Sequence, residues 1–239
     1  MIDLHCHLLW GMDDGARSSE ESLMLCRLAV INSINAIVAT PHFDDYYSVE
    51  KFVREREKKA DELREKAEKE GIDIGIGTGA EVLLSDGIFE VKDFTPLSVN
   101  ESRYVLCEYL LEPFDPKYAV IYAKRVLQKG FVPIIAHPER YKTFLDNRWI
   151  VEELSELGAL FQVNVPSLAG KGGEIIKEFS TELVLSNRVS ALGTDAHSPY
   201  SRSNDYADCR QSFDNRIDED MLKKLTIKNP YKIISNKDL

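Results

Sequence analysis

Short apolar or β-branched runs alternate with longer amphipathic stretches along the chain, and this alternation restricts the possible folds more than any other feature. It predicts an α/β protein in which repeated β/α units surround a parallel sheet. The chain has 239 residues with no low-complexity linker or internal repeat, and α/β barrels commonly occupy roughly 200–250 residues, so we expect one domain over residues 1–239. Seven strands are predicted, at Ile2–His7, Ala36–Thr40, Ile74–Glu81, Tyr104–Glu108, Val132–His137, Leu160–Val165 and Ser190–Asp195.

The amphipathic stretches predict helices between these strands. Ser18 or Ser19, followed by two glutamates, is a plausible N-cap for the first helix, and Gly71 ends the second helix as a C-cap would. The second helix carries many charges, and we expect it to be largely solvated. The predicted helices are Ser18–Ser33, Val49–Glu70, Pro116–Gln128, Trp149–Leu157, Glu174–Asn187 and Glu219–Leu225.

The charge balance and the apolar runs exclude some classes of partner. The net charge of −10 argues against nucleic acid, because affinity for a phosphate backbone depends on clustered Lys and Arg. No apolar run approaches the ~20 residues of a membrane helix, and Met1–His5 lacks the features of a signal peptide. We therefore expect a cytoplasmic protein that does not insert into a membrane.

The four cysteines, Cys6, Cys26, Cys107 and Cys209, are scattered and form no Cys-x-x-Cys pair. We expect reduced, mostly buried thiols. Cysteine-dependent phosphatases attack with a thiolate and hold the phosphate with an Arg six positions later. The residues six positions after these cysteines are Met12, Asn32, Pro113 and Asn215, so any removal of phosphate here must use other chemistry.

All five histidines lie at or just after the carboxyl ends of predicted strands. In a parallel sheet or barrel these ends open onto one face, where active sites form. His5 and His7 point to the same side of their strand, whereas Cys6 points to the other side. If each histidine were only a separately satisfied core residue, the five would be scattered, so joint placement favours a metal centre. The candidate ligands are His5, His7, Asp14, His42, Glu81, Glu108, His137, Asp195 and His197.

A donor set of imidazoles and carboxylates suits Zn, Mn or Fe, and it exceeds what one ion needs, so we expect two or three ions that share carboxylates. Such clusters clamp phosphoryl oxygens and lower the pKa of bound water toward ~7, which supplies hydroxide as a nucleophile. Arg140 and Arg202 follow two of the histidines closely and would grip phosphate oxygens, unless they form ordinary surface ion pairs.

These residues resemble the polymerase and histidinol phosphatase (PHP) superfamily, and within it the bacterial protein-tyrosine phosphatases of capsular and exopolysaccharide loci. The matching segments are Met1-Ile2-Asp3-Leu4-His5-Cys6-His7, Met12-Asp13-Asp14-Gly15-Ala16, Ala39-Thr40-Pro41-His42, Gly79-Ala80-Glu81-Val82, Ala136-His137-Pro138-Glu139-Arg140-Tyr141 and Gly193-Thr194-Asp195-Ala196-His197. The chain departs from the usual pattern at Trp10-Gly11 and at Ser198-Pro199-Tyr200-Ser201.

The resemblance implies a distorted seven-stranded, TIM-like β/α barrel that holds a trinuclear centre, usually assigned manganese, with iron or zinc possible. By position, the first ion would be held by His5, His7, Glu81 and Asp195, the second by Glu81, Glu108 and His137, and the third by Asp14, His42 and His197. Arg140 and Arg202 would hold the phosphate. The implied substrate is the tyrosine-rich tail of a bacterial tyrosine kinase that regulates polysaccharide synthesis.

We therefore expect a metal-dependent phosphatase that acts on phosphotyrosine in protein. Because a phenolate with a pKa of ~10 leaves readily, a strong general acid is dispensable, although Asp13, Asp195 or a bound water could supply the proton. Two alternatives are a small-molecule phosphatase, such as a histidinol-phosphate phosphatase, and a catalytically silent binding subunit. Four aromatic residues after strand ends could form a cleft for the phosphotyrosine ring or pack locally: Phe43, Tyr46, Tyr47 and Phe114.

Overall fold

The computed structural model describes residues 1–239 and contains two sheets in which every strand pair is parallel. The first sheet has the order β1 (Ile2–Cys6), β2 (Ala36–Ala39), β4 (Gly75–Thr78). The second has the order β3 (His42–Phe43), β5 (Glu81–Leu83), β6 (Tyr104–Glu108), β7 (Val132–Ala136), β8 (Leu160–Asn164), β9 (Val189–Gly193).

One predicted strand is divided in two, and the strand predicted at Ala36–Thr40 is followed by a further short strand. The chain passes from β2 to β3 across Thr40 and Pro41, and from β4 to β5 across Gly79 and Ala80, so the strand predicted at Ile74–Glu81 is in fact two. Proline cannot donate to a sheet ladder, and glycine tolerates close backbone approach. The segment β2–β3 still pairs with the segment β4–β5 across these interruptions, because Gly79 N donates to Ala39 O (2.9 Å) and Glu81 N donates to Pro41 O (3.1 Å). If β2 and β3 count as one barrel strand and β4 and β5 as another, the nine strands form seven barrel strands, as predicted.

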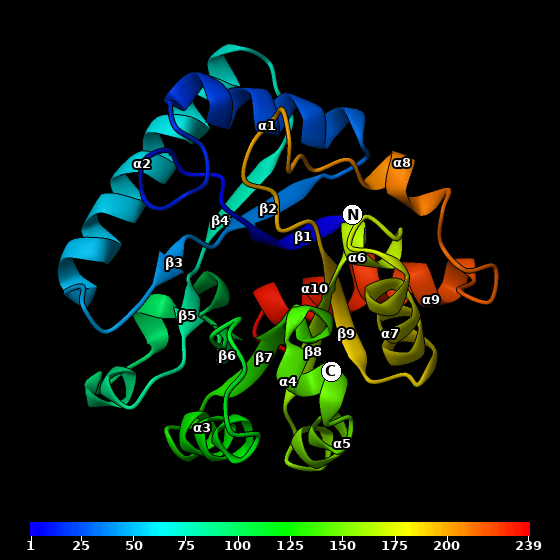
Figure 1. The fold of residues 1–239 in the computed structure, drawn as a ribbon. Coiled ribbons are helices and arrows are strands. Elements are labelled where there is room, and N and C mark those ends of the chain that lie inside the picture. Colours follow the sequence, from blue (N-terminus) through cyan, green and yellow to red (C-terminus); the bar gives the residue numbers. More distant parts are fainter.

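The first and last barrel strands are also hydrogen-bonded to each other. Asp195 N donates to His5 O (2.9 Å), and His7 N donates to Ala196 O (2.8 Å). The buried carboxylate of Asp3 accepts from the backbone and hydroxyl of Thr194. In Figure 1 the strands accordingly surround a common axis with helices outside them, which confirms the predicted distorted β/α barrel.

The six predicted helices are present, and their ends lie within two residues of the predicted ends. Ser18 is the N-cap of the first, where its hydroxyl accepts from Glu21 N. These helices are α1 (Ser19–Ile31), α2 (Val49–Lys69), α3 (Lys117–Gln128), α5 (Trp149–Glu156), α7 (Glu174–Leu185) and α9 (Glu219–Lys223). None of the chain's helices is both long and apolar enough to cross a membrane.

Several short helical segments are not predicted by the sequence pattern. The predicted strand Leu160–Val165 ends one residue early because Val165 begins a helix. The additional helices are α4 (Lys142–Asp146), α6 (Val165–Leu168), α8 (Tyr206–Arg210) and α10 (Asn229–Ile234). Single turns occur at η1 (Gly87–Glu90), η2 (Thr95–Leu97), η3 (Val99–Glu101) and η4 (Pro138–Arg140), and a π-helical turn, η5 (Lys224–Lys228), precedes α10.

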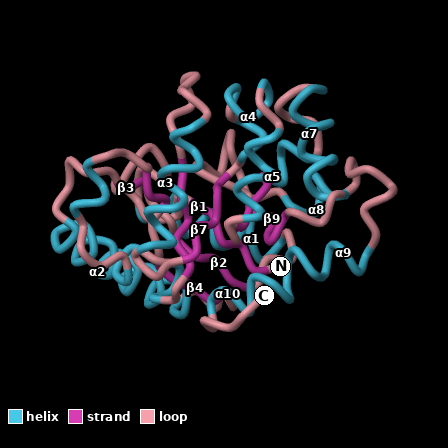
Figure 2. The backbone as a smooth tube through the Cα atoms, turned by 90° about the horizontal axis from the view of Figure 1, so that it is seen from below, coloured by secondary structure: helices cyan, strands magenta, loops and turns pink.

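The barrel interior is apolar at one end and polar at the other. Buried Leu4, Leu106 and Ile134 pack together inside the barrel, and Ile233 of α10 joins them. Figure 2 shows α10 at the end of the barrel opposite α4, which follows the carboxyl end of β7. The amino-terminal end of the barrel is therefore covered by α10, and the carboxyl-terminal end carries the polar side chains.

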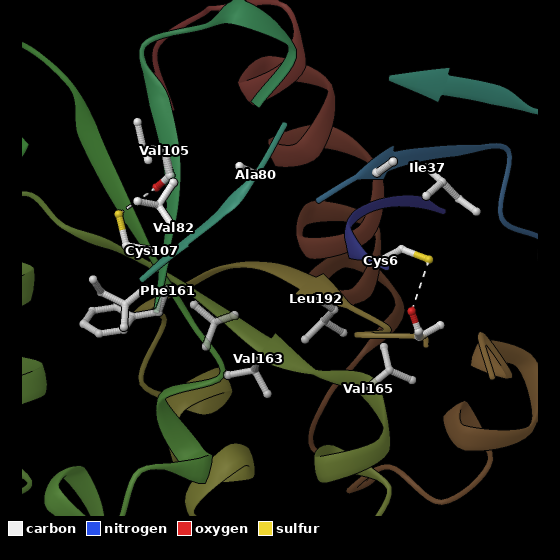
Figure 3. Packing of buried hydrophobic residues seen from close by; sticks show 14 of the residues in the cluster. Cys6, Ile37, Ala80, Val82, Val105, Cys107, Phe161, Val163, Val165 and Leu192 are labelled. Atoms are coloured by element: carbon white, nitrogen blue, oxygen red, sulfur yellow. Dashed lines mark hydrogen bonds between the residues drawn. The ribbon is translucent and has the colours of Figure 1, made fainter. Parts of the chain in front are cut away.

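A second apolar cluster lies between the strands and the outer helices, and it contains all four thiols. Cys6 Sγ contacts Ala196 O (3.6 Å) and Cys107 Sγ contacts Val105 O (3.4 Å), as Figure 3 shows. The prediction of reduced, buried cysteines is thus confirmed.

Helix α2 is less solvated than its composition suggests. Phe52, Arg56 and Leu63 are buried on its inner face. Arg56 Nη1 donates to Gly79 O and to Pro96 O, both at 2.9 Å. One buried guanidinium thus fastens this helix to the break between β4 and β5, directly before Glu81.

Candidate metal centre

The structure brings all nine predicted ligands together at the carboxyl end of the barrel. Their donor atoms form four groups, within each of which the atoms lie no more than 4.8 Å apart. The groups are His5, His7 and Glu81; His5, His137 and Asp195; His42, Glu81 and Glu108; and His7, Asp14, His42 and His197. The last group contains the three residues expected for the third ion together with His7, whereas Glu108 is grouped with His42 rather than with His137.

A bulge in β1 aims the first two histidines. Asp3 pairs with Ile37 and Cys6 with Ala39, so β1 has one residue more than β2 over this interval. An extra residue breaks the alternation of faces. Leu4 therefore belongs to the apolar interior, while His5 turns into the metal centre and Cys6 packs away from it.

Each of the first two imidazoles is held through Nδ1 by a buried acceptor. His7 Nδ1 lies 2.6 Å from Asp13 Oδ2, and His5 Nδ1 lies 2.7 Å from Gln162 Oε1. A nitrogen that donates to an oxygen leaves the other ring nitrogen free to bind a metal ion. The contacts thus direct the lone pairs of His5 Nε2 and His7 Nε2 toward the centre.

The Nε2 atoms of His5 and His7 converge on one carboxylate oxygen, Glu81 Oε2. His5 Nε2 and His7 Nε2 are 3.3 Å apart, and they lie 3.1 Å and 3.2 Å from Glu81 Oε2. Despite this proximity, buried Glu81 Oε2 makes no hydrogen bond of acceptable geometry. Protons on both nitrogens would place two like charges face to face, whereas one shared cation satisfies all three atoms. The residues therefore fit a divalent ion.

The remaining histidines also face predicted ligands, although His137 Nδ1 is buried without a hydrogen-bond partner. His197 Nδ1 faces Asp195 O (2.9 Å), and its Nε2 lies 3.3 Å from Asp14 Oδ1. His42 Nδ1 faces Glu108 Oε1 (2.7 Å). His137 Nε2 faces Glu81 Oε1 (2.8 Å). Every imidazole of the chain thus contacts an oxygen of another predicted ligand or of its backbone.

The carboxylates create a strongly negative field at this end of the barrel. Burial alone would lower the pKa of His5, but Glu81 and Asp195 outweigh it and raise that pKa to about 9. Metal ions bound here would compete with protons for the same nitrogens. Burial alone would raise the pKa of Asp13, but the hydrogen bond and charge of His7, together with the backbone donors of Gly15 and His42, outweigh it and lower that pKa to about 2. Asp13 is therefore well placed to orient His7 through its hydrogen bond to Nδ1.

Asp195 divides its two oxygens between the histidines and the arginines. Its Oδ1 lies 3.5 Å from His5 Nε2 and from His7 Nε2. Its Oδ2 accepts from Arg140 Nη1 (2.8 Å), Arg202 Nη2 (2.9 Å) and Asn164 Nδ2 (2.8 Å). The two arginines are thus fixed beside the predicted ligands rather than engaged in distant surface ion pairs.

The altered loop at Ser198–Ser201 closes on itself and presents Arg202. Arg202 O accepts from His197 N (2.8 Å) and from Ser198 N (3.2 Å). A cavity of about 340 Å³ opens beside this turn, and both arginines and Lys171 line it. Asp195 and Asp205 also line this cavity and pair with these cations, so three cationic and two anionic side chains face it.

The structure separates the four predicted cleft aromatics. Phe43 lies in β3 under α2 and is buried against Phe52, with ring centroids 4.8 Å apart. It therefore cannot contact the phosphotyrosine ring of a substrate. Tyr46 and Phe114 line an apolar hollow of about 390 Å³, whereas Tyr47 lines a different depression beside His42. The hollow adjoins the metal centre, since its Leu83 is the register partner of Glu108.

Three site residues were not identified as such from the sequence: Gln162 and Asn164 of β8, and Asp13, which was considered only as a proton donor. Two amides in an apolar strand resemble ordinary buried polar residues. Their spacing of two, which places them on one face of β8, is the only sequence signal that could have identified them.

The family model for capsular polysaccharide synthesis proteins, CpsB/CapC, matches residues 1–235. The tyrosine-protein phosphatase YwqE of Bacillus subtilis is 37% identical over 208 residues, which cover 85% of this chain and 80% of that protein. The tyrosine-protein phosphatase CpsB of Streptococcus pneumoniae is 28% identical over 245 residues, which cover 98% of each.

Solved structures agree with these relatives. A crystal structure from a study of YwqE and CpsB, described there as unique metal-dependent tyrosine phosphatases, matches with a TM-score of 0.89 and 31% identity over 100% of this chain and 96% of that one. A histidinol phosphate phosphatase from Lactococcus lactis, complexed with zinc, L-histidinol and phosphate, matches with a TM-score of 0.58, 15% identity and 93% coverage of each chain, which shows likeness of fold alone. The chain belongs to the CpsB/CapC family of capsular polysaccharide synthesis proteins.

Proposed function

We propose that this chain is a metal-dependent protein-tyrosine phosphatase whose metal ligands are His5, His7, Asp14, His42, Glu81, Glu108, His137, Asp195 and His197. The observation that carries the proposal is the convergence of His5 Nε2, His7 Nε2 and Glu81 Oε2 within 3.3 Å, with both Nδ1 atoms already committed to other acceptors. The relatives named as tyrosine phosphatases support the choice of substrate class.

Two or three divalent ions, with manganese as the first choice and iron or zinc as alternatives, fit the number and type of donors. When bound, they would polarise the phosphoryl oxygens and lower the pKa of water. The ligand geometry leaves Glu81 in two groups, and it is therefore the carboxylate best placed to be shared.

The chain's own side chains orient the phosphate. Arg140 and Arg202 are both held on Asp195 Oδ2, and both line the 340 Å³ cavity. Guanidinium groups fixed in this way can bind non-bridging phosphate oxygens with little loss of conformational entropy. Asp195, whose pKa is kept well below its usual range by His5 and His7 despite burial, stays ionised and holds the arginines in place. The leaving phenolate, with a pKa of ~10, requires little assistance from an acid.

The physiological substrate in this proposal is a phosphotyrosine protein, in particular the tail of a bacterial tyrosine kinase that controls capsular or exopolysaccharide synthesis, and the site of action is the cytoplasm. The apolar hollow beside Glu108 would accept a hydrophobic side chain of that polypeptide next to the phosphotyrosine. We also propose that residues 1–239 act as one domain, because β1 and β9 are hydrogen-bonded and α10 covers the barrel they form.

The test compares hydrolysis of a phosphotyrosine peptide with hydrolysis of histidinol phosphate, before and after chelation. We expect turnover of the peptide to be preferred, to disappear with chelator and to return with a divalent ion. His137→Ala and Asp195→Ala should abolish turnover and release metal. Cys6→Ala is the matched control, because Cys6 lies between His5 and His7 but packs away from them. A preference for histidinol phosphate would support the small-molecule alternative, and full activity in both site variants would refute the mechanism.

A further inference from the structure

Strand β8 contributes none of the nine predicted ligands, whereas every other barrel strand contributes at least one. It contributes Gln162 and Asn164 instead, which are 0% and 4% exposed. Three successive hydrogen bonds connect two ligands through these side chains. They join His5 Nδ1 to Gln162 Oε1 (2.7 Å), Gln162 Nε2 to Asn164 Oδ1 (2.9 Å), and Asn164 Nδ2 to Asp195 Oδ2 (2.8 Å).

Asp195 determines which group donates and which accepts in each of these three hydrogen bonds. An ionised carboxylate only accepts hydrogen bonds, so the Asn164 group that faces Asp195 must be the NH₂. Asn164 Oδ1 then faces Gln162 and requires the Gln162 NH₂ as its donor. Gln162 Oε1 in turn faces His5 and requires a proton on His5 Nδ1. The charge of Asp195 thus places a proton on His5 Nδ1 through two amides, and it leaves Nε2 as the nitrogen that can bind a metal ion in place of a proton.

The surroundings of the two amides are shaped to hold them. Asn164 N donates to Glu139 Oε1 (2.9 Å), which anchors the end of β8 to the turn after β7. Gly193 is the register partner of Asn164. A Cβ atom at Gly193 would lie 2.8 Å from Gln162 Nε2 and 2.9 Å from His5 Cβ, so only glycine leaves room for the amide to cross between the strands.

We propose that Gln162 and Asn164 are positioning residues which act as one amide relay, holding His5 ready to bind metal and coupling it to Asp195. The proposal rests on the proposed metal-dependent function and adds to it the part played by the barrel strand that lacks ligands. Hydrogen bonds to the outer nitrogen of a histidine ligand fix its orientation, and their loss typically lowers metal affinity 10- to 100-fold.

The test measures the affinity for Mn²⁺ by competition with a chelator in the parent, Gln162→Leu, Asn164→Leu and the double variant. Each single change should weaken metal binding at the site that contains His5 about 10- to 100-fold. Either change breaks the same relay. The affinity of the double variant for Mn²⁺ should therefore be no lower than that of the single variant with the lower affinity, whereas independent effects would multiply. Affinities within twofold of the parent, or losses that multiply, would overturn the proposal.

Two controls separate the relay from general damage to β8. Val163→Ala changes a buried residue of the same strand that belongs to the outer apolar cluster, and it should lower stability without weakening metal binding. Equal metal loss in this variant would refute the relay. If a relay variant fails to fold, nitrogen NMR of the zinc-loaded parent is decisive: a proton on His5 Nδ1 is expected, and a proton on Nε2 overturns the assignment. Neither the Mn²⁺ affinity nor the NMR measurement depends on hydrolysis. A protein that gave the expected affinities and the expected His5 proton but hydrolysed no phosphotyrosine would therefore contradict the proposed function and leave the relay intact.

Discussion

The buried guanidinium of Arg56 provides the sharpest stability test of the fold. Arg56→Met keeps an unbranched side chain of similar length but removes the donors to Gly79 O and Pro96 O. It also removes the ion pair with Glu57, which contributes about 1 kcal/mol or less because the Glu57 side chain is 39% exposed. Hydrogen bonds from charged groups contribute about 1.5–3 kcal/mol each. Two such bonds total about 3–6 kcal/mol, and removing a buried cation recovers part of this through its desolvation. We therefore expect the free energy of unfolding to fall by about 3 kcal/mol.

Urea denaturation followed by circular dichroism measures this loss. With an m-value of about 2.5 kcal/mol/M, the midpoint should fall by about 1 M. Arg64→Met is the matched control on the same helix, because Arg64 Nε donates to a single carbonyl, Ile76 O (3.0 Å), and 38% of the side chain is exposed. It should cost about 1 kcal/mol or less. Equal midpoints for the Arg56 and Arg64 variants would refute the argument.

Three further outcomes are expected. Leu106→Ala, inside the barrel, should lower the free energy of unfolding by about 2–5 kcal/mol, and an unchanged denaturation midpoint would contradict its packing role. Phe114→Ala should raise KM for a phosphotyrosine peptide but not for p-nitrophenyl phosphate, since only the peptide reaches the apolar hollow. Burial raises the pKa of Cys26 to about 12 and that of Cys209 to about 11, so thiolates form only at high pH. Iodoacetamide at pH 8 should therefore leave the native chain unlabelled by mass spectrometry and fully active.

The parallel barrel and the collection of ligands were predictable because both follow from local pattern. Strand-length apolar runs determine the barrel strands, and parallel strands place their carboxyl ends on one face. A histidine or carboxylate at such an end, as at His137 or Glu81, therefore reaches the site whatever the details of packing. The spacing of His5 and His7 also indicated correctly that Cys6 points elsewhere.

The breaks in the barrel and the relay were not predictable, because they depend on partners far away in the sequence. The chain passes from β4 to β5 with Gly79 held by Arg56, 23 residues earlier, and nothing in the local sequence encodes that contact. Gln162 is useful only because His5, 157 residues away, lies opposite it. The sequence could not choose between the two alternatives for Phe43 for the same reason, since burial under α2 is decided by tertiary packing.

Backbone strain at two ligands indicates that the centre is organised by the protein and not by the ions alone. His137 and Asp195 have left-handed conformations, with φ of 34° and 53°. Such conformations cost about 1–2 kcal/mol each for residues other than glycine. The surrounding structure maintains them: Arg140 N donates to His137 O (2.9 Å), and Asp195 N donates to His5 O (2.9 Å). Because these bonds, the Asp13 contact and the amide relay involve protein groups only, the ligands should keep their positions after chelation. Metal removal should therefore abolish activity while the barrel stays folded.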